Sequence, residues 1–135
     1  MRFMVMVRAT ADSESGRLPT REEFERMGEF NEQLIKAGIM LAGEGLQPSS
    51  KGARIRFDEG RATVIDGPFA ETKELIAGYW LVQVKSKEEA VEWFSRAPMQ
   101  PGWTLELRQV YEVEDFGDNV TPEMIAREEQ LRSRA

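Results

Sequence analysis

The sequence contains neither cysteine nor histidine among its 135 residues. The lack of cysteine excludes disulfides, zinc–thiolate sites and thiol catalysis. The lack of histidine removes the usual general base near neutral pH and the commonest metal ligand. Any chemistry must therefore depend on Asp, Glu, Lys, Arg, Tyr, Ser or Thr, or on an imported cofactor. We expect no bound metal and no resident cofactor.

Basic residues and long apolar runs are also scarce. The chain has 18 Lys and Arg against 24 Asp and Glu, a net charge of −6. Since nucleic-acid affinity comes mainly from basic side chains that neutralise phosphates, we expect no nucleic-acid partner. No run approaches the roughly 18 apolar residues that span a bilayer. The apolar start, Met1 to Val7, has no cleavage site of a signal peptide. We expect a cytoplasmic protein without a membrane partner.

Hydrophobic periodicity predicts two β-α-β units with a hairpin between them. Strands are expected at 3–7, 39–43, 53–57, 61–65, 77–84 and 104–113, and helices that begin at Thr20, Ser86 and Thr121. Residues 9–19 and 115–119 are expected to be loops. Ile55 and Phe57 alternate with Arg54 and Arg56, so the hairpin is predicted to have one solvated face.

Capping signals and apolar spacing define the helices more closely. Thr20 and Glu23 match a capping box, and Thr121 followed by Pro122 opens the last helix. The residues predicted to face the core are Phe24, Met27, Phe30, Leu34 and Ile35 in the first helix, and Ala90, Val91 and Phe94 in the second. The last helix has only a thin apolar stripe, so it is expected on the surface or across a partner chain.

This order of elements predicts a ferredoxin-like α+β sandwich over residues 1–113, with residues 114–135 as a C-terminal extension. Both helices would cover one face of the sheet and leave the other bare. The first strand, Phe3 to Val7, is continuously apolar, which is typical of strands covered on both faces. Because monomers rarely expose so large an apolar patch, the pattern predicts a homodimer in which a second copy covers the bare face.

Three ordered blocks resemble a known family: Gly43-Glu44-Gly45-Leu46-Gln47-Pro48, Asp66-Gly67-Pro68-Phe69-Ala70-Glu71-Thr72-Lys73-Glu74 and Gly78-Tyr79-Trp80. They resemble the YCII-related family and, more narrowly, its subgroup named for the Asp-Gly-Pro-Phe tetrapeptide, over roughly Met1 to Val113. The resemblance implies a dimeric α/β barrel of ferredoxin-like subunits. In better-studied relatives a His–Asp pair in a cleft has been proposed as catalytic. This chain lacks the histidine, and Asp66 matches the acid only by approximate position. The resemblance also implies a regulatory association with extracytoplasmic-function sigma factors.

Asp66 and Glu44 are the candidate acid–base residues. Asp66 ends a strand before a glycine, where it serves either as a carboxylate at a pocket mouth or as the side chain of an Asx-type turn. Glu44 lies between Gly43 and Gly45, where a ligand can approach closely. The alternative is a solvated glutamate at a strand end.

Glu106 and Arg108 are two residues apart on one face of a strand, and we expect that face to line the dimer interior. Buried charges need partners, so the two residues either pair with each other or across the dimer, or they bind a polar ligand. Arg108 is the candidate for holding an anion, because its fork matches carboxylate geometry. Tyr79 and Trp80 point to opposite faces, so one of them can line the same cavity.

The remaining candidates have simpler alternatives. Phe69 either walls a pocket or belongs to the core, and Lys73 either contacts a ligand or lies in a charged surface segment. Ser49 has no base at a readable spacing, so nucleophilic catalysis is not expected there. The sequence favours a homodimer that binds a small polar or anionic molecule, or a regulatory protein. The alternative is a small cofactor-independent enzyme that uses Asp66 or Glu44 with Arg108 as the anion clamp.

Overall fold

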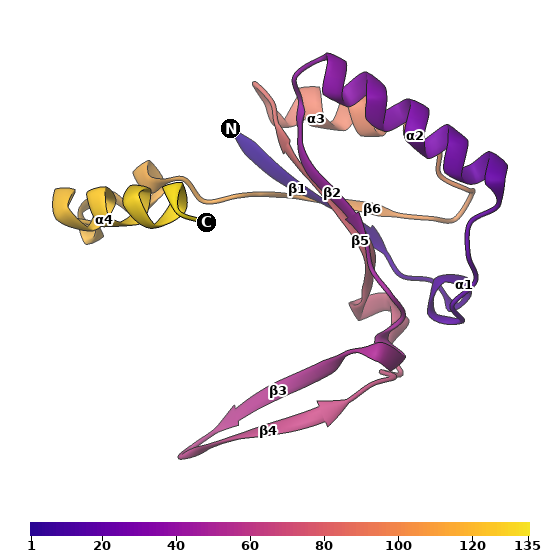
Figure 1. The fold of residues 1–135 in the computed structure, drawn as a ribbon, viewed down its shortest axis with the longest axis horizontal. Helices are drawn as coiled ribbons and strands as arrows, with labels where there is room; N and C mark the ends of the chain where they lie inside the picture. The colour runs from indigo at the N-terminus through magenta and orange to yellow at the C-terminus, as the bar shows by residue number, and fades with distance from the viewer.

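A four-stranded antiparallel sheet forms the centre of the computed structural model, which describes all 135 residues (Figure 1). Its strands are β1 (Arg2–Arg8), β2 (Met40–Gly45), β5 (Ile76–Gln83) and β6 (Leu105–Gln109), in the order β2-β5-β1-β6. Each neighbouring pair is antiparallel. The first strand of each β-α-β unit, β1 or β5, is therefore central. This is the ferredoxin-like arrangement, and it confirms the predicted fold class.

Two helices, α2 (Arg21–Lys36) and α3 (Lys87–Phe94), lie on one face of this sheet (Figure 1). The buried cluster between the two layers consists of Phe3, Val5, Phe30, Leu34, Ile39, Trp80, Val82, Val84, Ala90 and Phe94. It contains no buried polar residue. The opposite face of the sheet has no helix over it, as predicted from the order of the elements (Figure 1).

Three residues predicted to face the core do not. The side chains of Phe24 and Ile35 are 71% and 60% exposed, and Val91 on α3 is 48% exposed. The reason is angular: at 3.6 residues per turn, Ile35 lies about 100° around the helix from the fully buried Leu34. The apolar stripe of α2 that meets the sheet is therefore narrower than the sequence pattern, and it centres on Phe30 and Leu34.

Neighbouring residues on α2 give a direct test of this packing. We expect Leu34→Ala to lower the free energy of unfolding by about 2–5 kcal/mol, because it leaves a cavity at a side chain with no exposed surface. Ile35→Ala is the matched control and should change the stability by less than about 1 kcal/mol. Urea unfolding followed by circular dichroism measures both. Equal losses in the two variants would contradict this assignment of the helix face.

The hairpin of β3 (Ala53–Asp58) and β4 (Arg61–Asp66) forms a separate two-stranded sheet that extends away from the body (Figure 1). One of its faces is apolar, with Ile55 opposite Val64 and Phe57 opposite Ala62. Phe57 is 80% exposed. The prediction of a single solvated face was therefore wrong for the isolated chain: both faces are largely uncovered, because other segments of the chain contact the hairpin only at its base.

Short helical turns occupy three of the connections. They are α1 (Ala11–Glu14), which lies within the expected loop 9–19, and the 3-10 turns η1 (Ser49–Lys51) and η2 (Thr72–Glu74). Thr10 and Ser13 cap α1 reciprocally, with Thr10 N donating to Ser13 Oγ and Ser13 N donating to Thr10 Oγ1. At α2, Thr20 Oγ1 accepts from Glu23 N at 3.1 Å. The predicted capping box is only half formed there, since the Glu23 carboxylate binds Arg17 instead.

The C-terminal part leaves the sheet earlier than predicted. Strand β6 ends at Gln109, and the 3-10 segment η3 (Val113–Asn119) replaces both the expected strand end and the following loop. Helix α4 (Pro122–Ser133) is capped by Thr121, as predicted, and has no buried residue. It extends on the side of the sheet away from α2 and α3, as the hairpin does (Figure 1). None of the helices is both long and apolar enough to cross a membrane.

Candidate functional site

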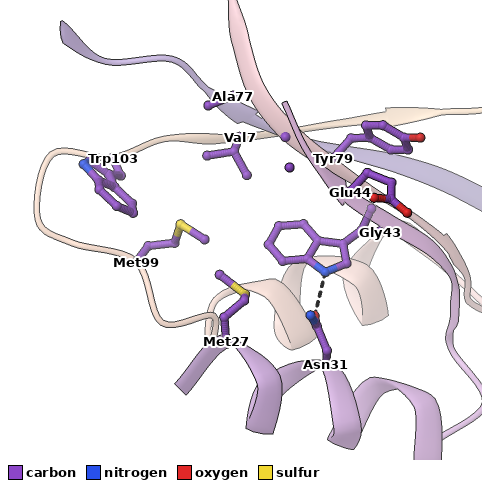
Figure 2. Close-up of a pocket in the computed structure, with 12 residues that line it drawn as sticks. Val7, Met27, Asn31, Gly43, Glu44, Ala77, Tyr79, Met99 and Trp103 are labelled. Carbon is purple, nitrogen blue, oxygen red and sulfur yellow. Dashed lines mark hydrogen bonds between the residues drawn. The ribbon is translucent and has the colours of Figure 1, made fainter. Parts of the chain in front are cut away.

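A cavity of about 250 Å³ lies between α2, the β2–β5 edge of the sheet and the segment after α3 (Figure 2). We call it the α2–sheet pocket. The side chains that surround it are mostly apolar or aromatic. Its lining residues are Val7, Met27, Asn31, Gly43, Glu44, Gly45, Ala77, Gly78, Tyr79, Trp80, Met99 and Trp103.

Glycines form the floor of the α2–sheet pocket where β2 meets β5. Gly43 pairs with Trp80, and Gly45 pairs with Gly78, so these positions share the helix-side face of the sheet. A Cβ added at Gly43 would lie 2.7 Å from Met40 Cε, and one at Gly78 would lie 3.0 Å from the Glu44 carbonyl oxygen. A Cβ at Gly45 would meet nothing within 4 Å. The first two glycines permit close packing, whereas the third leaves open space.

Trp80 is a rigid wall of the pocket. Its side chain is 5% exposed, and its ring lies 6.1 Å from Phe30 and 5.1 Å from Phe94 between centroids. The indole N–H donates to Asn31 Oδ1 at 2.8 Å, which ties the sheet to α2 (Figure 2). The sequence singled out Trp80 as a possible cavity residue. It did not single out Asn31, because a lone polar residue within a helix carries no pattern.

Tyr79 and Glu44 contribute only the edge of the pocket. They are direct cross-strand partners, and their side chains point away from Met27, Met99 and Trp103 (Figure 2). Tyr79 and Trp80 therefore point to opposite faces, as predicted. The Glu44 carboxylate lies on the uncovered face, so no acidic side chain enters the α2–sheet pocket.

The uncovered face of the sheet, which we call the open face, holds most of the other predicted residues. Strand register places Glu44, Tyr79, Met6 and Glu106 in one row across the four strands. The next row contains Ala42, Leu81, Met4 and Arg108. The centre of the open face is thus apolar, with charges at its two edges. Glu44 and Glu106 lie three strand spacings apart, about 14 Å.

Glu106 is held between two arginines. Arg8 Nη1 contacts Glu106 Oε1 at 2.7 Å, and Arg108 Nη1 lies 3.6 Å from Glu106 Oε2. The predicted pairing of Glu106 with Arg108 is present, but Arg8 is the closer partner. The Arg108 side chain is 73% exposed and is held only weakly. This group is accessible from the open face, on the other side of the sheet from the α2–sheet pocket.

Asp66 lies apart from both groups. It ends β4 opposite Ala53, in the separate hairpin sheet, and is exposed. Its carboxylate forms no hydrogen bond or ion pair, so the Asx-type bond is not present. A single chain therefore does not bring Asp66 together with Glu44 and Arg108. No group of three or more acidic residues is arranged to hold a metal ion.

The residues after Asp66 anchor the base of the hairpin. Gly67 N donates to Gly52 O at 3.0 Å, and Phe69 N donates to Ser49 Oγ at 3.0 Å. The guanidinium of Arg54 lies 3.8 Å from the centre of the Phe69 ring, which is half-buried. Lys73 lies exposed in η2 without an ion pair. In this chain the Asp-Gly-Pro-Phe segment thus makes structural contacts.

Ser49 has a carboxylate partner that the sequence did not reveal. Its hydroxyl and its backbone N–H both donate to Glu14, which lies 35 positions earlier. These two hydrogen bonds, that from the hydroxyl first, hold the pKa of Glu14 below its usual value. A carboxylate with a lowered pKa is a weak base, and Ser49 Oγ also accepts from Phe69 N. The pair therefore links α1 to the hairpin base rather than forming an activated nucleophile.

A curated protein of Rhizobium meliloti (strain 1021), "Uncharacterized protein R00369", is 34% identical over 77 residues, which cover 54% of this chain and 62% of that protein. This chain thus matches less than two thirds of that relative's length. Among solved structures, 5-chloro-2-hydroxyhydroquinone dehydrochlorinase (TftG) from Burkholderia phenoliruptrix AC1100, in complex with 2,5-dihydroxybenzoquinone, aligns with a TM-score of 0.40. It is 13% identical, and the alignment covers 84% of this chain and 98% of that one.

The family assignment rests on the sequence itself. The model of the YCII-related domain matches residues 1–116, from β1 into η3. The match includes every strand, both helices that cover the sheet, and the Asp-Gly-Pro-Phe segment. Helix α4 lies outside it. This chain belongs to the YCII-related domain family.

Proposed function

We propose that this protein binds a small, uncharged, ring-shaped molecule in the α2–sheet pocket. The observation that supports the proposal most directly is the open floor at Gly45, below walls formed by Trp80, Trp103 and two methionines. Pockets for drug-sized ligands usually measure about 300–1,000 Å³. A cavity of about 250 Å³ is suited to a molecule of about one ring.

The composition of the walls narrows the ligand further. Flat aromatic and flexible thioether side chains favour a planar apolar body. No Arg or Lys lines the pocket, so an anion would lie there without a counter-charge. Arg108, the predicted anion clamp, is on the other face of the sheet. The structure therefore gives more support to an uncharged ligand than to an anion.

We also propose that the protein is a homodimer whose open faces pack together. Met4, Met6, Tyr79 and Leu81 are only partly exposed within one chain, yet no other segment covers them. A second sheet would remove this apolar strip from water at about 25 cal/mol per Å² of buried surface. Residues 1–113 would then form the paired domain. The extension, residues 114–135, would reach towards the partner, since α4 lies on that side (Figure 1).

The two other functions considered from the sequence have less support. Catalysis by Asp66 or Glu44 would need a carboxylate in the α2–sheet pocket, and neither side chain enters it. A regulatory protein partner, as in a sigma-factor-linked role, would need a surface of its own. Binding of a small molecule requires neither a carboxylate in the pocket nor a separate protein-binding surface. The protein with its ligand bound could still act as an enzyme or as a regulator.

Filling the pocket from its floor tests the proposed function. Gly45→Val adds a branched side chain where there is free space, and a β-branched residue suits a strand. We expect it to weaken binding of one-ring fragments at least tenfold, measured by NMR titration of the tryptophan indole N–H signals. The melting temperature should not fall.

The matched control is Gly28→Ala, which fills open space on α2 outside the pocket and should leave fragment binding unchanged. Fragments that bind Gly45→Val as tightly as the unmodified protein would rule out the α2–sheet pocket as their site.

A further inference from the structure

Asn31 is the lining residue whose amide head group lies beside the Trp80 indole (Figure 2). An indole N–H can only donate, so the atom that faces it must be the amide oxygen. The orientation of the Asn31 amide is therefore fixed by chemistry. The Oδ1 atom accepts one hydrogen bond from Trp80, and the NH₂ group is on the other side of the amide.

The Asn31 NH₂ group has no partner within the chain. It appears in none of the hydrogen bonds, which include only Oδ1 of this residue. No fully buried side-chain nitrogen or oxygen lacks a partner, so this NH₂ group reaches open space. The pocket is the cavity that Asn31 lines. The Asn31 NH₂ group is thus an unpaired donor on a residue that lines the pocket.

The other polar side chains around the pocket do not supply a matching acceptor. The indole of Trp80 is already bound to Asn31, and the side chains of Glu44 and Tyr79 point to the open face. The Trp103 indole can only donate. Apart from the second lone pair of Asn31 Oδ1, a ligand hydroxyl or amine acting as donor would find no side-chain oxygen to receive its proton.

We propose that Asn31 selects ligands with a hydrogen-bond acceptor oxygen on the ring, such as a ring-bound carbonyl, over ligands of the same shape without one. This inference rests on the proposed function, because it assigns a chemical class to the ligand of the α2–sheet pocket. Trp80 is the positioning residue, since it holds the amide with its NH₂ group free. Leaving those N–H bonds unpaired beneath an apolar ligand costs affinity, and discrimination follows from that cost.

The test compares acetophenone with α-methylstyrene, in which a CH₂ group replaces the carbonyl oxygen. We expect acetophenone to bind the unmodified protein roughly tenfold more tightly, by NMR titration of the Trp80 and Trp103 indole signals. Asn31→Asp keeps the acceptor for Trp80 but replaces the free donor with a second oxygen. It should abolish the preference for acetophenone while the Trp80 indole signal still shows a hydrogen bond.

Asn119→Asp is the matched control, because it makes the same chemical change at an exposed position outside the pocket. It should leave the preference intact. Equal binding of the two compounds to the unmodified protein would overturn the acceptor selectivity and leave the proposed function standing. If neither compound shifts the indole signals at millimolar concentration, both proposals fail.

Discussion

Gly67→Ala should destabilise the protein by roughly 1–3 kcal/mol or more, the largest effect we expect from the addition of one methyl group. A Cβ at this position would overlap the backbone carbonyl of Ser49 far inside van der Waals contact. The obstacle is backbone rather than a flexible side chain, so it cannot rotate away. Either η1 must shift or the hydrogen bond from Gly67 N to Gly52 O must break. Urea unfolding of the purified variant measures the loss.

Gly52→Ala is the control for this substitution, because Gly52 is the hydrogen-bonding partner of Gly67 at the base of the same hairpin. A Cβ there would lie 3.6 Å from the same Ser49 oxygen, which is an ordinary contact. We expect a change within about 1 kcal/mol. If Gly67→Ala were as stable as Gly52→Ala, the close approach at the Asp-Gly-Pro-Phe segment would not exist.

Leu81→Arg should convert the proposed dimer to a monomer. Leu81 lies at the apolar centre of the open face, next to Met4 in register. A two-fold interface would receive two new arginines, and a buried charge without a partner costs several kcal/mol. We expect the dimer dissociation constant to rise about 100-fold or more. Light scattering after size exclusion would show the mass fall towards the 15.4 kDa of one chain.

The matched control is Ile35→Arg, which replaces an exposed apolar residue on α2, in the layer that covers the other face of the sheet. It should remain dimeric. If the unmodified protein already has the mass of one chain at micromolar concentration, the proposed dimer is wrong. If Leu81→Arg stays dimeric, the open face is not the interface.

The fold could be predicted because each part of it leaves a local pattern. The spacing of apolar residues differs between strands and helices, so each type of element can be recognised. Thr20, Ser86 and Thr121 accept the capping hydrogen bonds expected of them. Element boundaries were harder to predict where two signals compete. The apolar alternation continues past Gln109, but the chain leaves the sheet there and Tyr111 stacks on Phe116 at 5.1 Å.

The α2–sheet pocket could be predicted only in part, because its residues belong to no common pattern. Trp80 was singled out from a conspicuous block, and Glu44 from its flanking glycines. Asn31, Met99 and Trp103 come from distant segments that only the packing of α2 and the segment after α3 brings together. The pairing of Glu14 with Ser49 was missed for the same reason. The role of a carboxylate or amide side chain can be inferred only when its hydrogen-bonding partner is known.

The two ends of the hairpin meet at its base, where Gly67 and Gly52 are joined by one hydrogen bond. The β3–β4 hairpin therefore leaves the body of the protein and returns to it at the same place. The hairpin can be lengthened, shortened or replaced without moving a strand of the central sheet. The entropic cost of closing such a loop grows only slowly with its length. In this chain the base of the hairpin is therefore a site where new segments can be inserted while the α2–sheet pocket stays intact.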